Sequence, residues 1–371
     1  MRRIYIHQLP EWPMFTWDQE ALVPLLAAVR NRQGKLAGRM ESLGFPLNQE
    51  AGLETLTADV VKSSEIEGER LNLEQVRSSL ARRLGVEVGG LKPADRHVDG
   101  VVEMVLDATQ HYDRPLTADR LWGWHAALFP TGRSGLVRIS TTAWRRDQHG
   151  PIRVVSGPMG RERVHFEAPA ARRVAREMRA FLRWFNGRRK STDPVMKAAL
   201  AHLWFVTIHP FDDGNGRIAR AIADMALTRS EESPQRFYSM SAQIRDERTA
   251  YYDVLERTQR GTMDVTTWMT WFLECLDRAI GGAQGMLATV FGKARFWQAL
   301  AGVPVNDRQR TLLRRMQENS FEGKLTTSKY ARLAKCSQDT ALRDVEALVE
   351  WGALVRGPGG GRSTSYELAA R

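Results

Sequence analysis

The sequence has 371 residues, 43% of them hydrophobic, and a formal net charge of +11 at pH 7, and this length predicts two or three domains with apolar cores. The two cysteines, Cys275 and Cys336, provide neither a disulfide framework nor a metal site, and no stretch resembles a signal peptide or a membrane span, so we expect a cytoplasmic protein with no membrane partner. The positive charge favours anionic partners, and nucleotides, nucleic acids and acidic protein surfaces all remain open.

Residues 1–115 are predicted to form an N-terminal domain that opens with an extended arm. Residues 4–18 are rich in aromatic side chains and proline, which favours an arm packed on the rest of the protein. A helix is expected to follow over residues 19–43.

A second N-terminal helix is expected over residues 54–69, and it contains the sequence SSEIEGE. Ser63 and Glu67 are four residues apart, so they share one face of this helix. Gly68 weakens or ends the helix directly after Glu67. An exposed side chain is the commonest outcome for a helical Glu; the alternative is an ion pair with a cation elsewhere in the chain.

Residues 116–290 are predicted to form a second, helical domain. Its first helix is expected over 116–129, with Thr117 as the N-cap. His125 has apolar neighbours in this helix, which indicates a packed histidine rather than a ligand. Helices with apolar stripes are also expected over 172–186 and 267–276.

A β-hairpin is predicted over residues 152–166, inside this second domain. Apolar residues alternate on both sides of the turn-forming segment SGPMGRER, as expected for paired strands. These alternating residues are Ile152, Val154, Val164 and Phe166.

The stretch HPFDDGNGRIAR, residues 209–220, lies between two helical patterns. An apolar run over 198–208 precedes it, and apolar residues at helical spacing follow over 218–226, which predicts helix, tight loop, helix. Gly214 and Gly216 allow the backbone to approach a ligand closely. The free N–H groups at the start of the second helix favour an anion.

The side chains of this stretch suit phosphoryl or nucleotidyl transfer to a hydroxyl. Arg217 and Arg220 lie one turn apart and can bind phosphate oxygens. Asp212 or Asp213 can hold a hard cation such as Mg²⁺, and His209 can accept a proton near neutral pH. The spacing fits neither a Walker-type phosphate loop nor an EF-hand.

Residues 304–371 are predicted to form a third domain of three helices and two strands. The helices are expected over 307–318, 327–334 and 338–351. Ser337 is the expected N-cap of the last helix, and Gly352 its terminator. Its buried stripe is predicted to contain Ala341, Leu342, Val345, Leu348 and Val349, and its outer face Gln338, Asp339, Thr340 and Arg343.

This order resembles a winged helix-turn-helix domain, with Arg356 and Arg362 on a wing over 356–362. The resemblance implies DNA contact through residues 338–343 and the wing. Residues 307–371 have twelve Lys and Arg against eight Asp and Glu, about +4, and several of the acids lie on the last helix. Protein interaction or dimerisation is therefore the alternative, and a homodimer is left open.

The stretch 209–220 fills every defining position of HPFx[DE]GNGRxxR, so the chain resembles the Fic family. Most Fic enzymes of this pattern transfer AMP from ATP to a Ser, Thr or Tyr hydroxyl of a protein. The resemblance thus implies ATP as substrate, Mg²⁺ as cofactor and a target protein as partner. The Doc branch, which phosphorylates, has Lys where this chain has Gly216.

The resemblance also implies a role for each residue of the motif. His209 is the general base, Phe211 anchors the loop in the core, and Asp213 holds Mg²⁺. The phosphate-binding residues are Gly214, Asn215 and Gly216 around the α- and β-phosphates, Arg217 on the β-phosphate and Arg220 on the γ-phosphate.

Two further segments resemble parts of Fic proteins. Ser63, Glu67 and Gly68 match the inhibitory motif [ST]xxxE[GN], which implies that Glu67 occupies the Arg220 guanidinium that ATP needs; in some relatives the equivalent Glu also supports removal of AMP. The hairpin 152–166 corresponds to the flap, which holds the target segment as an added strand. Residues implied near the nucleoside, with ordinary packing as the alternative, are Val155, Ser156, Gly157, Tyr251, Tyr252 and Gln259.

We therefore expect a mainly α-helical protein: a Fic-type helical bundle with a β-hairpin flap, followed by a winged helix-turn-helix domain. The expected function is protein AMPylation, including self-AMPylation, inhibited by pairing of Glu67 with Arg220. One alternative is a DNA-binding regulator that senses nucleotide. Another is a Fic enzyme that transfers a different nucleotide or phosphate, or that removes AMP.

Overall fold

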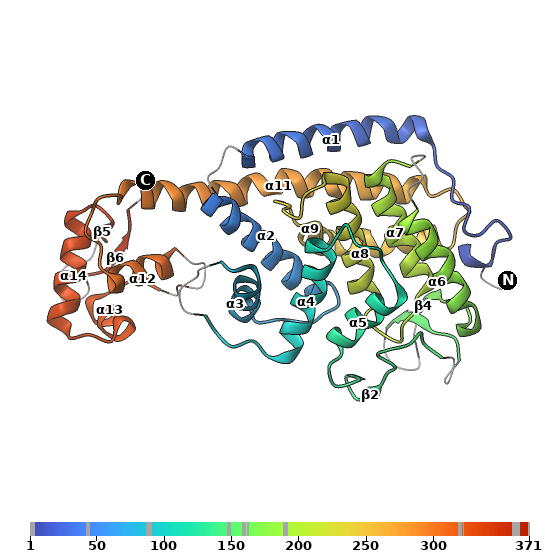
Figure 1. Ribbon diagram of the computed structural model, residues 1–371, viewed down its shortest axis with the longest axis horizontal. Helices are drawn as coiled ribbons and strands as arrows, with labels where there is room; N and C mark the ends of the chain where they lie inside the picture. The colour runs from blue at the N-terminus through green and yellow to red at the C-terminus, as the bar shows by residue number, and fades with distance from the viewer. Residues whose placement is uncertain are drawn as a thin grey trace. The chain divides into compact units, whose positions relative to one another are not determined.

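A computed structural model describes residues 4–41, 45–86, 91–146, 150–157, 161, 163–187, 192–317, 321, 323–357 and 364–369. The chain is mainly helical, as the sequence predicts (Figure 1). It divides into two compact units. The first unit consists of Met1–Val86 and Lys92–Gln284, and the second consists of Glu87–Leu91 and Gly285–Arg371. The division into domains 1–115, 116–290 and 304–371 stays a prediction.

The first unit contains most of the helices. They are α1 (Gln19–Glu41), α2 (Phe45–Ile66), α3 (Leu73–Leu84), α4 (Arg96–Gln110), α5 (Ala118–Leu128), α6 (Ala171–Asn186), α7 (Pro194–Ile208), α8 (Asn215–Glu231), α9 (Met240–Asp246) and α10 (Arg248–Gln259). Its shorter elements are η1 (Ile6–Gln8), β1 (Arg133–Ser134), β2 (Val137–Arg138), β3 (Arg153–Ser156) and β4 (Arg163–Glu167). The long helix α11 (Thr266–Ala299) begins in this unit and ends in the second.

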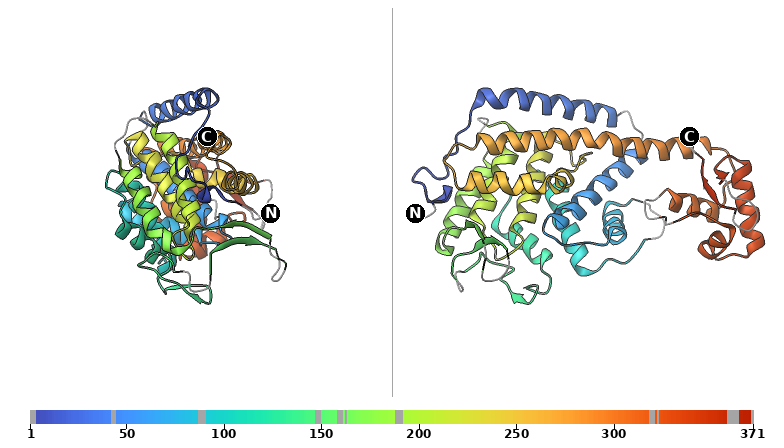
Figure 2. Two further views of the ribbon diagram at one scale, coloured as in Figure 1. Left: turned by 90° about the vertical axis from the view of Figure 1, so that its right-hand side faces the viewer. Right: turned by 180° about the vertical axis from the view of Figure 1, so that it is seen from behind.

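Helix α7 is buried inside the first unit, whose helices Figure 2 shows from two further directions. From Val195 to Ile208 every residue of α7 is buried except Lys197. A helix that is apolar on all sides has to be enclosed by other elements. It packs against α8, and the loop between the two is therefore fixed from both ends.

Helix α2 differs from the predicted span. It begins at Phe45, nine residues before the expected start at 54, and it ends at Ile66 rather than at 69. Gly68 has φ +85°, a left-handed conformation that suits glycine and that ends a helix. The N–H of Glu69 then donates to the carbonyl oxygen of Ser64 at 3.0 Å, which closes the end of the helix.

A buried ion cluster fastens α2 to α8. Arg236 Nη2 lies 2.6 Å from Asp224 Oδ1 on α8 and 3.4 Å from Asp59 Oδ2 on α2. Ser239 Oγ donates to the other oxygen of Asp59 at 2.5 Å. Burial and the neighbouring Asp224 raise the pKa of Asp59, and the Arg236 charge opposes that rise.

Replacing Arg236 with methionine is expected to lower the free energy of unfolding by about 3–5 kcal/mol. The substitution leaves Asp59 and Asp224 buried together without their cation. Urea denaturation followed by circular dichroism would measure the loss, with Arg257→Met as a control at an exposed arginine of α10. Equal stability of the two variants would contradict this reading of the cluster.

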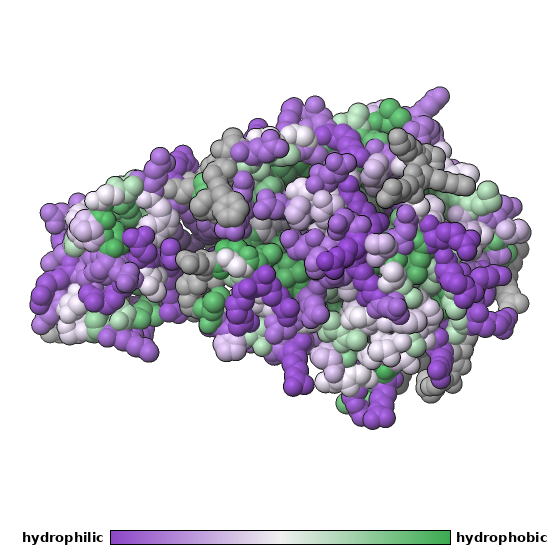
Figure 3. Space-filling model, viewed as in Figure 1, coloured by the Kyte–Doolittle hydropathy of each residue, from purple (hydrophilic) through white to green (hydrophobic). Residues whose placement is uncertain are grey.

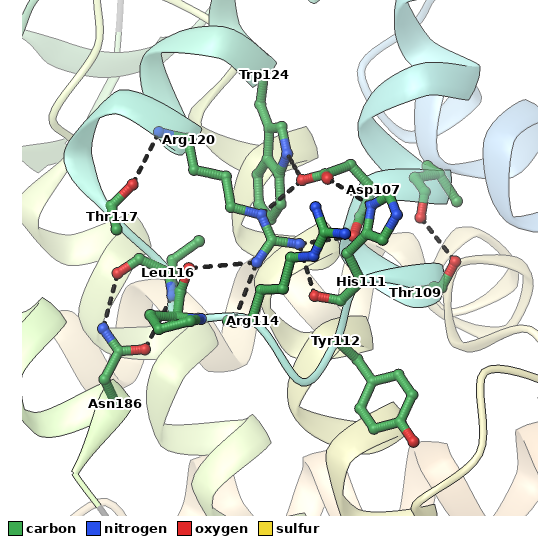
Figure 4. A network of polar contacts seen from close by, with 12 residues as sticks. Asp107, Thr109, His111, Tyr112, Arg114, Leu116, Thr117, Arg120, Trp124 and Asn186 are labelled. Carbon is green, nitrogen blue, oxygen red and sulfur yellow. Dashed lines mark hydrogen bonds and ion pairs between the residues drawn. The ribbon is translucent and has the colours of Figure 1, made fainter.

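A second polar network holds α5 in place (Figure 4). Thr117 caps the helix, as predicted, by accepting from the N–H of Arg120. The Arg120 guanidinium donates to the Asp107 carboxylate at 2.6 Å, and Trp124 Nε1 donates to the same oxygen at 2.6 Å. Asn186 at the end of α6 bonds both backbone groups of the residue before Thr117. This network fixes the helix that lies beneath the predicted catalytic loop.

The predicted hairpin is present as the antiparallel pair β3 and β4. Val154 lies opposite Phe166, and a register irregularity follows between Val154 and Val155. Phe166 is buried and contacts the edge of Tyr5 from the N-terminal arm, with ring centroids 5.2 Å apart. Part of the turn, 158–160 and 162, lies outside the described residues.

The second unit contains three helices followed by two antiparallel strands. They are α12 (Asp307–Met316), α13 (Thr327–Ala334), α14 (Gln338–Glu350), β5 (Leu354–Arg356) and β6 (Tyr366–Leu368). Its core contains the buried side chains Leu312, Leu313, Leu325, Tyr330, Ala341, Val345, Leu348, Leu354 and Tyr366. The order of elements matches the expectation, and the assignment as a winged helix stays a prediction.

The prediction that Leu342 belongs to the buried stripe of α14 is wrong, because this side chain is 42% exposed. It follows the buried Ala341, so the helix turns it toward the outer face with Arg343. Ser337 caps α14 as predicted, accepting from Thr340 N–H at 3.2 Å. Arg362, predicted on the wing, lies outside the described residues.

The molecular surface in Figure 3 is mostly hydrophilic on the face drawn, with small apolar areas between charged side chains. Among the residues that the structure describes, no helix combines the length and apolar character needed to span a membrane.

Candidate active site

The predicted catalytic loop connects the end of α7 to the start of α8. His209 closes α7 with φ +52°, a left-handed conformation that is rare for a residue other than glycine and that is concentrated at functional sites. Gly214 precedes α8 with φ +78°, and a Cβ at this position would lie 2.9 Å from the Phe129 ring. The Asn215 side chain bonds both the N–H and the carbonyl oxygen of Phe211, at 3.0 and 2.9 Å. The loop is thus closed by its own residues.

Aromatic packing supports the loop from below. Phe211 is fully buried, and His125 stacks on it with ring centroids 4.2 Å apart. The prediction that His125 is packed is confirmed. Its Nε2 also lies 3.1 Å from the carbonyl oxygen of Asp213, a contact with the loop that sequence reasoning missed.

Arg145 is a further residue that sequence reasoning missed. It is 2% exposed, and its Nε donates to the carbonyl oxygen of His209 at 2.7 Å. Its backbone N–H donates to the carbonyl oxygen of Pro210 at 3.0 Å. Because it bonds two successive carbonyl groups, Arg145 holds the backbone at the point where α7 ends.

The His209 imidazole is prepared to accept a proton. Its Nδ1 lies 3.2 Å from the Val206 carbonyl oxygen, and since that oxygen can only accept, Nδ1 must be the protonated nitrogen. Burial lowers the pKa of His209 to about 4, with the Arg145 charge acting in the same direction. The ring is therefore neutral near pH 7, and the lone pair of Nε2 is available.

Arg220 meets the end of α2. Its Nε donates to Ser63 Oγ at 2.9 Å, and its Nη2 donates to the Ser63 carbonyl oxygen at 2.9 Å and to Glu67 Oε1 at 2.8 Å. A Cβ at Gly216 would clash with Glu67 Oε1 and would lie 3.3 Å from Arg220 Nη1. The Glu67 carboxylate therefore covers the first turn of α8, where the helix favours an anion.

Arg217 has a different acidic partner. Its Nη1 donates to Glu69 Oε2 at 2.8 Å, and Glu69 Oε1 lies 2.6 Å from His97 Nε2 on α4. Within the described part of the chain, the buried atoms Arg217 Nε and Arg220 Nη1 have no hydrogen-bond partner. Unpartnered guanidinium nitrogens beside a helix N-terminus suit a phosphate ligand.

The two acidic residues of the loop differ in their surroundings. Asp213 is exposed; its Oδ1 accepts from the Gly214 N–H at 2.6 Å and its Oδ2 from Ser134 Oγ at 2.5 Å. Asp212 is half-buried and accepts from the backbone N–H of Ser140 at 3.2 Å. The segment after β2 therefore covers part of Asp212.

Whether this site fits Mg²⁺ depends on the oxygen ligands that its side chains offer. No group of three His, Cys, Asp or Glu side chains arranged to bind a metal occurs in the ranges that the structure describes. Magnesium is commonly bound by one or two carboxylates, with phosphate oxygens and water as the other ligands. The exposed Asp213 carboxylate beside the start of α8 fits that mode of binding. The described residues do not provide a Mg²⁺ site built from protein ligands alone.

The hairpin is fastened to α10, which carries three of the six predicted nucleoside residues. Glu256 on α10 binds His165 Nδ1, and Ser156 Oγ lies 2.5 Å from His165 Nε2. Arg260 donates to the carbonyl oxygens of Val164 and His165, at 2.7 and 3.1 Å. The hairpin and α10 are thus one connected structure.

The predicted nucleoside residues have unequal exposure. On the hairpin, Val155, Ser156 and Gly157 are exposed. On α10, Tyr251 and Gln259 are buried, and they bond His202 and Thr207 of α7 at 3.0 and 3.1 Å. Tyr252 is 36% exposed and has the Arg248 guanidinium over its ring. Contact with a nucleoside stays a prediction for all six residues.

Comparison with known proteins identifies two regions. Residues 115–227 match the model of the Fic/DOC family, and residues 5–86 match a domain of unknown function, DUF4172. A protein adenylyltransferase Fic of Drosophila sechellia is 34% identical over 104 residues, which are 28% of this chain and 20% of that protein. The corresponding protein of Drosophila mojavensis is 26% identical over 219 residues, 58% of this chain and 38% of that protein. The chain thus spans well under half the length of these curated relatives.

Solved structures show the same fold. A Fic family protein from Desulfovibrio desulfuricans superimposes with a TM-score of 0.55 at 24% identity, over 97% of this chain and 98% of that one. A Fic domain containing signaling protein from Bacteroides thetaiotaomicron has a TM-score of 0.51 at 21% identity, over 70% and 97%. The family match at residues 115–227 includes the whole loop 209–220, and the solved structures support a Fic-type fold around it.

Proposed function

We propose that this protein transfers AMP from ATP to a Ser, Thr or Tyr hydroxyl of a protein. The observation that carries the proposal is the neutral His209, with Nδ1 bound to the Val206 carbonyl oxygen, in one loop with two α8 arginines whose buried nitrogens lack partners among the described residues. The imidazole of His209 provides a proton acceptor for an attacking hydroxyl. The two arginines provide cations for a polyphosphate.

In the proposed reaction the target hydroxyl gives its proton to Nε2 of His209 while its oxygen attacks the α-phosphorus of ATP. The bond from the α-phosphorus to the bridging oxygen breaks, and pyrophosphate leaves. Arg217, Arg220 and the N–H groups at the start of α8 stabilise the negative charge that develops on it. Mg²⁺ held by Asp213 would neutralise phosphate charge as well.

Glu67 is proposed to inhibit this reaction. Its carboxylate lies over Gly216 and pairs with Arg220, which is only 2% exposed. A phosphate group and this carboxylate would compete for one guanidinium and one helix terminus. ATP then binds weakly, or binds with its α-phosphate turned away from His209.

The hairpin is proposed to receive the target. The side chains of β3 are exposed along the strand, so an extended segment could pair with it through backbone hydrogen bonds. The connection of β4 to α10 through Glu256 and Arg260 would keep that segment at a fixed distance from the loop.

The test is transfer of label from ATP by the Glu67→Gly variant, alone and with cell lysate. ATP labelled at the α-phosphate is compared with ATP labelled at the γ-phosphate, and intact mass is measured in parallel. Label in protein from the α-position only, with a mass gain of AMP, is the expected result. Label from the γ-position would indicate a kinase instead, and no label in any protein from either position would refute transfer.

A further inference from the structure

Glu67 and Glu69 both pair with an arginine of the loop, but their surroundings differ. The left-handed Gly68 between them turns the chain, so the two carboxylates point to different arginines. The Glu67 oxygen would collide with a Cβ at Gly216, whereas no such contact involves Glu69. Glu67 therefore occupies the anion site, and Glu69 approaches Arg217 away from the Gly216 position.

Arg217 is held on two sides. Phe129 packs against the guanidinium face, 5.1 Å from the ring centroid, and Glu69 bonds Nη1. The side chain is 6% exposed, and its buried Nε has no partner in the described residues. A guanidinium that is held at its face and at one nitrogen presents its remaining N–H groups in a fixed orientation. A further acceptor can then bind them with little loss of conformational entropy.

Glu69 is itself fixed. Its backbone N–H donates to the Ser64 carbonyl oxygen, and its second carboxylate oxygen lies 2.6 Å from His97 Nε2. This close contact with His97 lowers the pKa of Glu69, with the Arg217 charge acting in the same direction, so Glu69 is a carboxylate at neutral pH. Because Glu69 is held by its own backbone and by a second side chain, its carboxylate stays in place and can fix the orientation of Arg217.

We infer that Glu69 is a positioning residue, which presents the free edge of Arg217 to the β-phosphate and so promotes nucleotide binding, in opposition to its neighbour Glu67. This inference rests on the proposed function for the identity of the nucleotide. It assigns opposite effects to two acidic residues that are two positions apart. His97 supports the same orientation through Glu69.

Affinities for AMP and ADP separate this role from a structural one, because only ADP has a β-phosphate. In the Glu67→Gly protein, Glu69→Gln is expected to weaken ADP binding about tenfold, the size of one lost charge-assisted hydrogen bond, and to leave AMP binding unchanged. Calorimetric titration with AMP and ADP measures both. His97→Gln is expected to give a smaller loss for ADP in the same direction.

Glu65→Gln is the matched control. Glu65 lies in the last turn of α2 and pairs with Lys62 and Arg245, away from both loop arginines. It is expected to change neither affinity. Tighter ADP binding by Glu69→Gln would make Glu69 a second inhibitory residue and overturn the inference, as would no change or an equal loss for AMP and ADP.

These results also separate the inference from the proposed function. If Glu67→Gly binds ADP in the expected way but transfers no AMP, the proposed function fails and the role of Glu69 stands. If transfer occurs and Glu69→Gln does not alter ADP binding, only the inference fails.

Discussion

Adding His209→Ala to the Glu67→Gly protein is expected to lower the rate of AMP transfer by about 10²- to 10⁴-fold, the usual contribution of a general base. The imidazole has its free lone pair on Nε2, and no other side chain of the loop is a neutral base. ATP affinity should change little, because the proposed phosphate contacts come from α8 and its arginines. Initial rates with ATP labelled at the α-phosphate, together with calorimetric titration, would measure both quantities.

The pH dependence provides a second check on the same residue. Since burial lowers the pKa of His209 to about 4, the ring stays neutral as the pH falls from 8 to 5. Loss of rate from protonation of this base should begin only as the pH approaches 4. The control for His209→Ala is His111→Ala, which removes a half-exposed histidine after α4. An unchanged rate in the His209 variant would refute the mechanism.

The Glu67→Gly substitution alone is expected to tighten ATP binding by about 10- to 100-fold, within the usual range of coupling between two competing ligands. Removing the carboxylate removes its bond to Arg220 Nη2 and uncovers the Gly216 backbone, while Arg220 keeps its bonds to Ser63. Self-modification or transfer should rise with occupancy. Calorimetric titration of ATP into both proteins measures the effect.

Glu67→Gln distinguishes charge from occlusion. The amide has the same size and remains over Gly216, but it lacks the charge that pairs with Arg220. We expect an affinity between those of the starting protein and the glycine variant. If neither substitution changes ATP affinity, the contact between Glu67 and Arg220 has no inhibitory role.

Local patterns in the sequence were sufficient for the framework of the site. Helical spacing predicts that Ser63 and Glu67 share a face, and both contact Arg220. The apolar run before His209 predicts a buried helix, and α7 is enclosed on all sides. These inferences rest on periodicity within one element, which a single sequence contains.

The residues that were missed depend on contacts between distant segments. Glu69 lies beyond Gly68, where helical periodicity no longer applies, and its direction follows from the left-handed turn. His97 and Arg145 are separated from the loop by more than sixty residues, and nothing in their local sequence indicates a partner. The start of α2 was placed too late because residues 45–53 have no strong capping signal.

The attachment of α2 limits how the proposed inhibition can be relieved. The buried Arg236 cluster anchors the helix at Asp59, and Ile66, about two turns further on, is fully buried. Detaching the whole helix would expose both, whereas opening the chain after Ile66, where α2 ends, moves only Glu67 and the short segment that follows it. We expect relief to occur by local opening at the helix terminus, with a much smaller free energy than global unfolding. A target or partner that touches only these last residues could then set the activity while the rest of the domain stays folded.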